Sequence, residues 1–181
     1  MEQLSNDARA NQIRRPKFFY HAHARLPQAY DKYFENRKII VWAASAHNIK
    51  QPKKVEINKP DNEKYKNSIT MGEIVSEHFK NRMYSIAFTA YEGKMGFSYD
   101  FAPDLDIQKA EAGSFEYLCQ KVGQPIMYID FKTDTKDTSH WMQKPIKSRP
   151  MGYEYLEAIW PEQFDAMIYF DTVFPSAKII N

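Results

Sequence analysis

The sequence predicts an α/β fold with a largely parallel sheet and helices on both faces, and two observations lead to this class. Short apolar runs of strand length alternate with segments whose apolar residues recur at helical spacing. Residues 38–45 begin with Ile39, Ile40, Val41 and Trp42, an unbroken apolar run that is typical of a strand covered on both faces. Such an order of elements builds a three-layer α/β/α arrangement.

The composition fits one folded domain. The 181 residues are 43% hydrophobic and 15% aromatic, which is enough to bury a core. A net charge of only +2 argues against nucleic acid as the partner. The single cysteine excludes an intramolecular disulfide and suits a reducing compartment. Neither an amino-terminal apolar h-region nor an apolar run of bilayer length is found, so we expect a cytoplasmic protein that does not bind membranes.

The amino-terminal part is predicted to contain helix and an exposed loop. Helices are expected over residues 3–13 and 26–36, and the second has three aromatic residues at helical spacing before the strand at 38–45. Residues 50–66 contain six lysines against three acidic residues and are interrupted by prolines. This composition indicates a solvated loop rather than a platform for nucleic acid.

Two further helices follow from periodicity and capping. From residue 71 the apolar side chains recur with the period of a helix, which we place over residues 71–81 with His78 on its buried face. Ser114 is a favourable N-cap for a second helix, and Gly123 suits its carboxyl end. The apolar face expected for that second helix consists of Phe115, Leu118, Cys119 and Val122.

Further apolar runs give the other strands. Residues 84–91 are predicted to form a strand that ends at a Glu-Gly turn, and residues 95–101 return as the second strand of a short hairpin. Residues 126–131 and 166–173 complete the sheet. These strands alternate with the helices, as the predicted class requires.

A candidate site follows the strand at 38–45. Small residues leave room beside the chain there, and His47 comes directly after them. In open α/β sheets ligands gather beyond the carboxyl ends of strands, so His47 is expected at the rim of a crevice. An unperturbed imidazole titrates near pH ~6.5 and therefore suits a general base at neutral pH.

Several blocks of the chain resemble the erythromycin esterase family, and they occur in the family's order. The family pattern of an apolar strand followed by Trp-Ala-His-Asn-x-His is similar to residues 39–47 (IIVWAASAH). A Met-Gly helix, a strand and a Glu-Gly turn are similar to residues 71–73 (MGE) and 84–93 (YSIAFTAYEG). The closing segments of the family resemble residues 113–116 (GSFE), 149–152 (RPMG) and 164–171 (FDAMIYFD).

The resemblance implies a hydrolase of carboxylic esters or macrolide lactones, an activity connected with antibiotic resistance. It covers only the carboxyl-terminal portion of a family member, so residues 1–181 are expected to be a truncated, single α/β domain that is incomplete relative to the family fold. The portion not covered supplies the family's glutamate and its general-base histidine. The implied partners are a small-molecule ester or lactone and either an amino-terminal segment or a second copy of the chain.

The histidine motif can be aligned in two ways. Without a gap, Ala44 and Ser45 stand for the family's first histidine and asparagine, and His47 stands for the second histidine. With a gap, His47 and Asn48 match the first histidine and the asparagine, and Lys50 stands where the second histidine belongs. In either alignment the motif lacks at least one of its histidines. A non-catalytic remnant or a binding module is therefore the alternative function.

Hydrolysis by activated water needs a base, a group that orients it, and donors for the developing oxyanion. The predicted catalytic residues are His47 and Glu92, and the predicted substrate-binding residues are Trp42, Ser45 and Arg149. The forked guanidinium of Arg149 suits a carboxylate or an oxyanion. The structural alternatives are a histidine bonded to a loop, a glutamate of the turn and a solvated arginine.

No metal and no cofactor are predicted. His21 and His23 lack a third ligand at a regular spacing, and Cys119 is expected to be a small core residue. His140 is expected on a surface loop. The sequence contains neither the Gly-x-Ser-x-Gly motif of a serine hydrolase nor a Gly-rich phosphate loop.

Overall fold

The computed structural model describes residue 27 and residues 31–32, 37–56, 67–96, 104–132, 140–151 and 154–175. The helix expected over residues 3–13 and the pair His21 and His23 lie outside these ranges. Of the helix expected over residues 26–36, only residues 27, 31 and 32 are described, and all three are helical.

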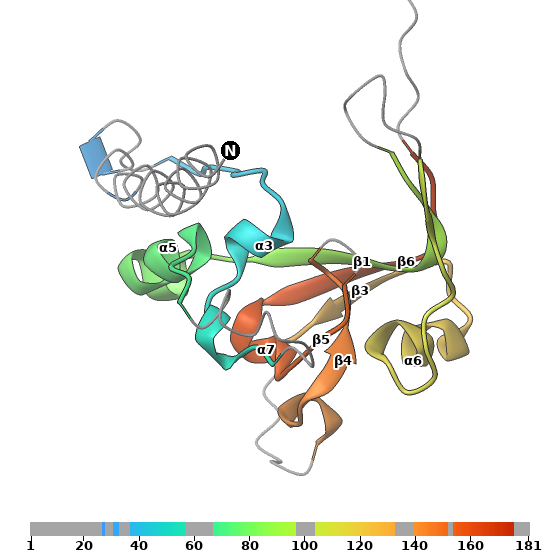
Figure 1. Ribbon diagram of the computed structural model, residues 1–181. Helices are drawn as coiled ribbons and strands as arrows, with labels where there is room; N and C mark the ends of the chain where they lie inside the picture. Colours follow the sequence, from blue (N-terminus) through green and yellow to red (C-terminus); the bar gives the residue numbers. More distant parts are fainter. Residues whose placement is uncertain are drawn as a thin grey trace, which may run out of the picture.

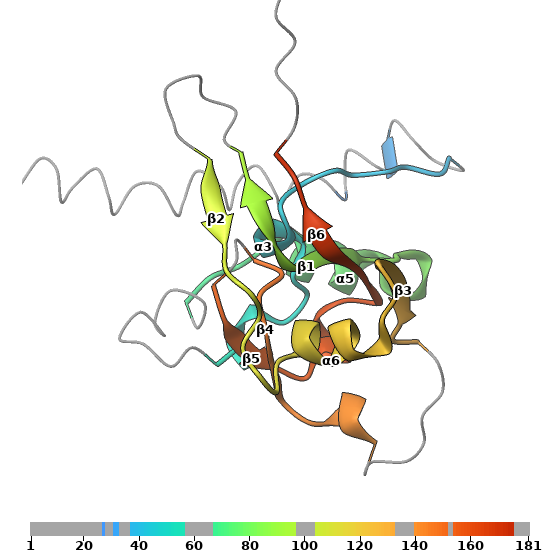
Figure 2. The ribbon, with the colours of Figure 1, turned by 90° about the vertical axis from the view of Figure 1, so that its right-hand side faces the viewer.

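Four strands form an open mixed sheet in the order β2-β1-β6-β3. Their bounds are β1 (Ile86–Met95), β2 (Leu105–Ile107), β3 (Ile126–Asp130) and β6 (Ala166–Val173). Only β1 and β6 are parallel, whereas β2 on β1 and β3 on β6 are antiparallel (Figures 1 and 2). The prediction of an α/β class is confirmed, but the sheet is mixed rather than largely parallel.

The remaining elements are short. A two-stranded antiparallel sheet consists of β4 (Ile146–Ser148) and β5 (Leu156–Ala158). The α-helices that lie wholly within the described residues are α3 (Ser45–Asn48), α5 (Met71–Phe79), α6 (Phe115–Val122) and α7 (Trp160–Gln163). Single turns of 3-10 helix cover Pro52–Lys54, Lys80–Arg82 and Trp141–Gln143. Within the described ranges, no helix is long and apolar enough to cross a bilayer.

Side-chain caps begin the two longer helices. The hydroxyl of Thr70 accepts a hydrogen bond from the amide of Glu73 at 3.1 Å, and Ser114 accepts one from the amide of Tyr117 at 3.3 Å. Gly123, with φ of 75°, ends α6 in the left-handed conformation. The caps predicted for the helix after Ser114 are therefore confirmed, because a serine hydroxyl and a glycine satisfy the helix ends.

The buried face of α6 differs from the predicted one. Phe115 and Cys119 are buried as expected, but Glu116 is buried with them. Leu118 and Val122 are instead 45% and 63% exposed. The helix is rotated toward its acidic residue because three hydrogen-bond donors meet the Glu116 carboxyl group in the interior.

The sheet is covered on one face in the described part of the chain. The register separates two faces, because alternate residues of a strand point to opposite sides. The covered face, under which α6, α7, β4 and β5 lie, carries Ala87, Thr89, Met127, Ile129, Met167 and Tyr169 (Figure 1). The outer face carries Ile86, Phe88, Ile126, Tyr128, Ile168 and Phe170. Among the described residues, α3 and residues 37–44 lie on the outer side (Figure 1), and the expected three-layer arrangement is not confirmed.

The strand predicted over residues 38–45 is wrong. Residues 37–44 have no regular secondary structure, and Ile40 and Trp42 are 92% and 83% exposed. A strand requires a neighbouring strand for its backbone hydrogen bonds, and residues 37–44 form no ladder with the described sheet. The hairpin differs as well, because β1 continues to Met95 and its antiparallel neighbour β2 begins only at Leu105.

Candidate functional site

His47 lies in α3, a single helical turn that contacts α5 and β1. Its amide donates to the carbonyl of Ala44 at 2.8 Å, and its side chain is exposed. The carbonyl of Asn48 accepts a hydrogen bond from the hydroxyl of Ser85 at 3.4 Å, one residue before β1 begins. His47 is therefore near the amino end of β1 and not beyond the carboxyl end of a strand.

Close backbone packing holds this turn against α5. A Cβ atom on Gly72 would lie 2.1 Å from the carbonyl oxygen of Asn48 and 2.5 Å from that of Ile49. The hydroxyl of Thr70, which caps α5, also donates to the carbonyl of Ile49 at 2.6 Å. The Met-Gly block therefore has a structural role, since only glycine lets the first turn of α5 approach the chain so closely.

Glu92 lies near the carboxyl end of β1, where it is half-buried opposite Thr172 of β6. The following Gly93 has φ of 134°, and a Cβ atom there would lie 2.1 Å from the carbonyl oxygen of Val173. This glycine is needed for the close pairing of β1 with β6. The predicted Glu-Gly turn is wrong, because β1 continues through it to Met95.

The two candidate catalytic residues lie at opposite ends of β1. Ser85, beside α3, and Glu92 are seven positions apart, and an extended strand advances about 3.3 Å per residue, which gives a separation of roughly 20 Å. A base and its orienting group must approach to about 3 Å. The described residues therefore do not bring His47 and Glu92 into one site.

The predicted substrate-binding residues near His47 lie on the outer side of the sheet. The ring of Trp42 is 5.5 Å from that of Phe88, centroid to centroid, at an interplanar angle of 49°. Ser45 is the half-buried first residue of α3. Trp42 and Ser45 therefore flank the turn that carries His47, whereas the third predicted residue, Arg149, lies elsewhere.

Arg149 is 4% exposed and binds the backbone of β1. Its Nε and Nη2 atoms donate to the carbonyl of Ala90 at 3.3 and 3.1 Å, and Nη2 also donates to the carbonyl of Tyr91. Its guanidinium carbon lies 5.3 Å from the ring centroid of Tyr155. Arg149 is not a solvated arginine, and its donors are directed to β1 carbonyls in this structure.

Glu116 organises the interior beside Arg149, and the sequence interpretation missed it. Its side chain is fully buried, and its Oε1 atom accepts from the hydroxyls of Thr89 and Ser148, at 2.6 and 2.5 Å, and from the amide of Arg149 at 3.0 Å. We call these four residues the Glu116 clamp. An acidic residue inside the apolar first turn of a capped helix is the signal that could have identified it.

Cys119 lies one helical turn beyond Glu116 and is a buried free thiol. Burial, with a smaller contribution from the nearby Glu116 carboxyl group, raises the pKa of Cys119 to about 12. The thiol is therefore protonated at neutral pH and is a poor nucleophile, which confirms the predicted core role. Among the residues that the structure describes, no three His, Cys, Asp or Glu side chains are grouped so that they could hold a metal ion.

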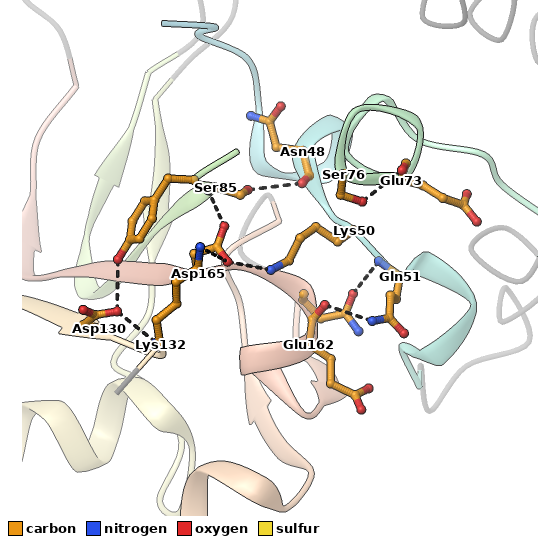
Figure 3. A network of polar contacts seen from close by, with 12 residues as sticks. Asn48, Lys50, Gln51, Glu73, Ser76, Ser85, Asp130, Lys132, Glu162 and Asp165 are labelled. Carbon is orange, nitrogen blue, oxygen red and sulfur yellow. Dashed lines mark hydrogen bonds and ion pairs between the residues drawn. The ribbon is translucent and has the colours of Figure 1, made fainter. Parts of the chain in front are cut away.

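A second polar network lies at the amino ends of β1 and β6 (Figure 3). Asp165, just before β6, accepts from the amide of Ser85 at 2.7 Å and pairs with Lys50 at 3.0 Å and Lys132 at 3.4 Å. It thereby joins the amino ends of the two parallel strands to the chain that follows α3. The buried position of Asp165 indicates a structural role for this network.

The two other histidines that the structure describes are outside these clusters. His78 was expected to be buried, but it is exposed and its Nε2 atom lies 2.9 Å from Oδ2 of Asp31. His140 caps a 3-10 turn by accepting from the amide of Met142 at 3.3 Å. Neither of them lies with His47 at α3.

These features define an α/β domain with an open mixed sheet, one covered face and an exposed histidine turn at one end. Residues 4–173 match the model of the family described as erythromycin esterase. The chain belongs to the erythromycin esterase family.

The chain is similar to parts of two known proteins. It is 29% identical over 159 residues to "Putative hydrolase YbfO" of Bacillus subtilis (strain 168), and the match covers 82% of this chain and 33% of YbfO. The fold is similar to the crystal structure of a succinoglycan biosynthesis protein, with a TM-score of 0.62, 22% identity and coverage of 82% of this chain and 36% of that one. The chain thus spans about a third of the length of both proteins.

Proposed function

We propose that the chain acts in an erythromycin esterase-like hydrolase that cleaves a carboxylic ester, such as a macrolide lactone, with base-activated water. The observation that supports this proposal is the family match over residues 4–173, which includes both His47 and Glu92. The exposed position of His47 gives it access to water and substrate. No cofactor enters the proposed reaction.

In the proposed reaction the imidazole of His47 takes a proton from water while the water oxygen attacks the carbonyl carbon. The tetrahedral intermediate then expels the alcohol oxygen, which receives the proton from the imidazolium. Donors must stabilise the oxyanion in between. Because Glu92 is roughly 20 Å from this turn, it neither orients His47 nor binds the oxyanion in the proposed reaction.

Turnover of erythromycin and of p-nitrophenyl acetate tests this proposal. We expect His47→Ala to lower turnover by ~100-fold or more, because general-base catalysis contributes at this scale. His78→Ala is the matched control, since His78 is also an exposed histidine. A His47→Ala variant with unchanged turnover would exclude His47 as the base, and a wild-type chain inactive on both substrates would contradict hydrolysis by this chain.

Binding without catalysis is the second candidate function. The separation of His47 and Glu92 at opposite ends of β1 favours it, because the two predicted catalytic residues then do not share one site. Isothermal titration with erythromycin distinguishes the two functions. Heat of binding without product formation supports a binding module, whereas product formation supports the hydrolase.

A further inference from the structure

The outer face of the sheet is an exposed apolar surface. Ile126 and Tyr128 of β3 are 61% and 56% exposed, and Ile86 and Phe88 of β1 are 37% and 39% exposed. Residues 39–42 continue this surface, because Trp42 packs on Phe88 while most of its own side chain remains exposed. Together, residues 39–42 and the outer face form what we call the outer patch.

The outer patch has the size of a stable interface. If a whole aromatic side chain contributes about 200 Å², the exposed parts of Trp42, Phe88 and Tyr128 present roughly 350 Å². The largest apolar patch on a typical monomer is about 300–600 Å². The patch also includes five partly exposed aliphatic side chains, those of Ile39, Ile40, Val41, Ile86 and Ile126. The whole patch thus approaches the ~800 Å² that each partner contributes to a standard interface.

We propose that a second copy of this chain covers the outer patch in a two-fold symmetric dimer. Most of the patch consists of apolar and tyrosine side chains. Glu92 and Asp130 lie on the same face at strand ends, and the Asp130 carboxylate accepts a hydrogen bond from the Tyr84 hydroxyl, so the centre of the patch can be covered without burying an unpaired charge. A formal net charge of only +2 per chain gives little long-range repulsion between copies. The proposal rests on this surface alone and does not depend on the proposed hydrolase activity.

The shape of the outer patch favours an antiparallel arrangement of the sheets of the two copies. At the amino half of β1 the raised segment 37–44 brings Trp42 onto Phe88, and α3 follows beside Ser85. The carboxyl half, near Ile126 and Phe170, lacks such a cover from the described chain. With the sheets antiparallel, the raised segment of each copy fits over the open half of the other. Parallel sheets would press the two raised segments together.

Sedimentation velocity of the full chain over a range of concentrations tests this proposal. We expect a reversible monomer–dimer equilibrium, with a dimer of twice the 21.3 kDa chain mass. Ile126→Lys and Ile40→Lys place an unpaired ammonium in the interface and should weaken dimerisation by roughly 100-fold or more. Val122→Lys is the matched control, because Val122 is 63% exposed, similar to Ile126, but lies on α6 under the covered face.

Each outcome decides the proposal. A wild-type dimer that both outer-patch variants convert to monomer, and that Val122→Lys leaves intact, supports it. A wild-type monomer at all concentrations, an open-ended aggregate, or a dimer insensitive to Ile126→Lys and Ile40→Lys overturns it. Circular dichroism confirms folding of each variant. If a lysine variant fails to fold, cross-linking of a mixture of Ile40→Cys and Ile126→Cys chains, compared with a mixture of Ile40→Cys and Val122→Cys chains, decides the same question through the yield of covalent dimer.

Discussion

The two faces of the sheet differ in a way that reverses the usual placement of polar and apolar residues. On the covered face Thr89 is 3% exposed and bonds to the fully buried Glu116. On the outer face of the same strand, its neighbour Phe88 is 39% exposed. Polar groups can be buried where every donor finds an acceptor, whereas the apolar outer face gains nothing until another surface covers it.

The covered face should determine the stability of the single chain, and the outer patch should determine its association with a second copy. The covered face contains the cluster formed by large buried side chains such as Trp160, Phe164 and Tyr169, together with the Glu116 clamp. The most exposed side chains of the outer patch, such as Ile40 and Trp42, contribute little to the stability of a single chain, because they remain in water. Substitutions on the two faces should therefore change different measured quantities.

The largest expected loss of stability is at the Glu116 clamp. Glu116→Ala removes the acceptor for Thr89, Ser148 and Arg149, and breaking such a buried charged network costs about 3–5 kcal/mol. Glu116→Gln retains an acceptor oxygen and should lose less, about 1–2 kcal/mol. Urea unfolding measures both. Equal stability of Glu116→Ala and wild type would show that the clamp does not hold the covered face together.

The same substitution, tryptophan to alanine, can be made on each face of the sheet and its cost in stability compared. Trp160 is 1% exposed and its indole donates to the carbonyl of Ile146 at 2.8 Å, so Trp160→Ala should cost about 3–5 kcal/mol. Trp42→Ala should cost under about 1 kcal/mol, because Trp42 is largely exposed. Thermal and urea unfolding at protein concentrations that favour the monomer test this pair. Similar losses for both tryptophans would refute the contrast.

A smaller effect is expected where α5 meets the histidine turn. Gly72→Ala forces a Cβ atom against the Asn48 carbonyl and should cost about 1–3 kcal/mol through overpacking. Ser76→Ala on the same helix, which only removes a bond to the carbonyl of Glu73, should stay within about 0.5 kcal/mol. Chemical denaturation of the two variants measures this difference. A Gly72→Ala variant as stable as Ser76→Ala would contradict the close approach.

The smallest effect concerns pH. Because the fold raises the pKa of Cys119 from 9.0 to about 12, the folded state favours the protonated thiol. This contribution to stability is complete below pH 9 and is lost progressively as the pH rises toward 12. The unfolding free energy of Cys119→Ala should therefore fall less over this interval than that of the wild type. Parallel curves for the two proteins would contradict the raised pKa.

Local signals in the sequence predicted much of the fold. The helix at residues 71–81, the helix after Ser114 and the strands at 84–91, 126–131 and 166–173 all match elements of the structure to within a few residues. Their signals are caps and apolar periodicity, which act over one or two turns. Short elements such as α7 and the pair β4 and β5 escaped because their stability comes from tertiary contacts.

The sequence predictions failed where contacts with distant parts of the chain decide the local structure. The run at residues 38–45 has the composition of a buried strand, but a strand also requires a neighbour, and composition does not supply one. The buried carboxyl group of Glu116 depends on donors up to 33 positions away in the sequence. Similarly, the position of His47 near the amino end of β1 follows from contacts of Asn48 and Gly72, which no local pattern reveals.

Hydroxyl-radical footprinting across a range of protein concentrations tests the contrast between the faces most directly. Trp42 belongs to the outer patch, whereas Trp141, which is 44% exposed, packs against Phe115 on the covered side. We expect oxidation of Trp42 and Tyr128 to fall as concentration rises, while oxidation of Trp141 stays constant. If Trp42 is equally reactive at every concentration, or if both tryptophans are protected alike, the outer patch is not the surface that a second copy covers.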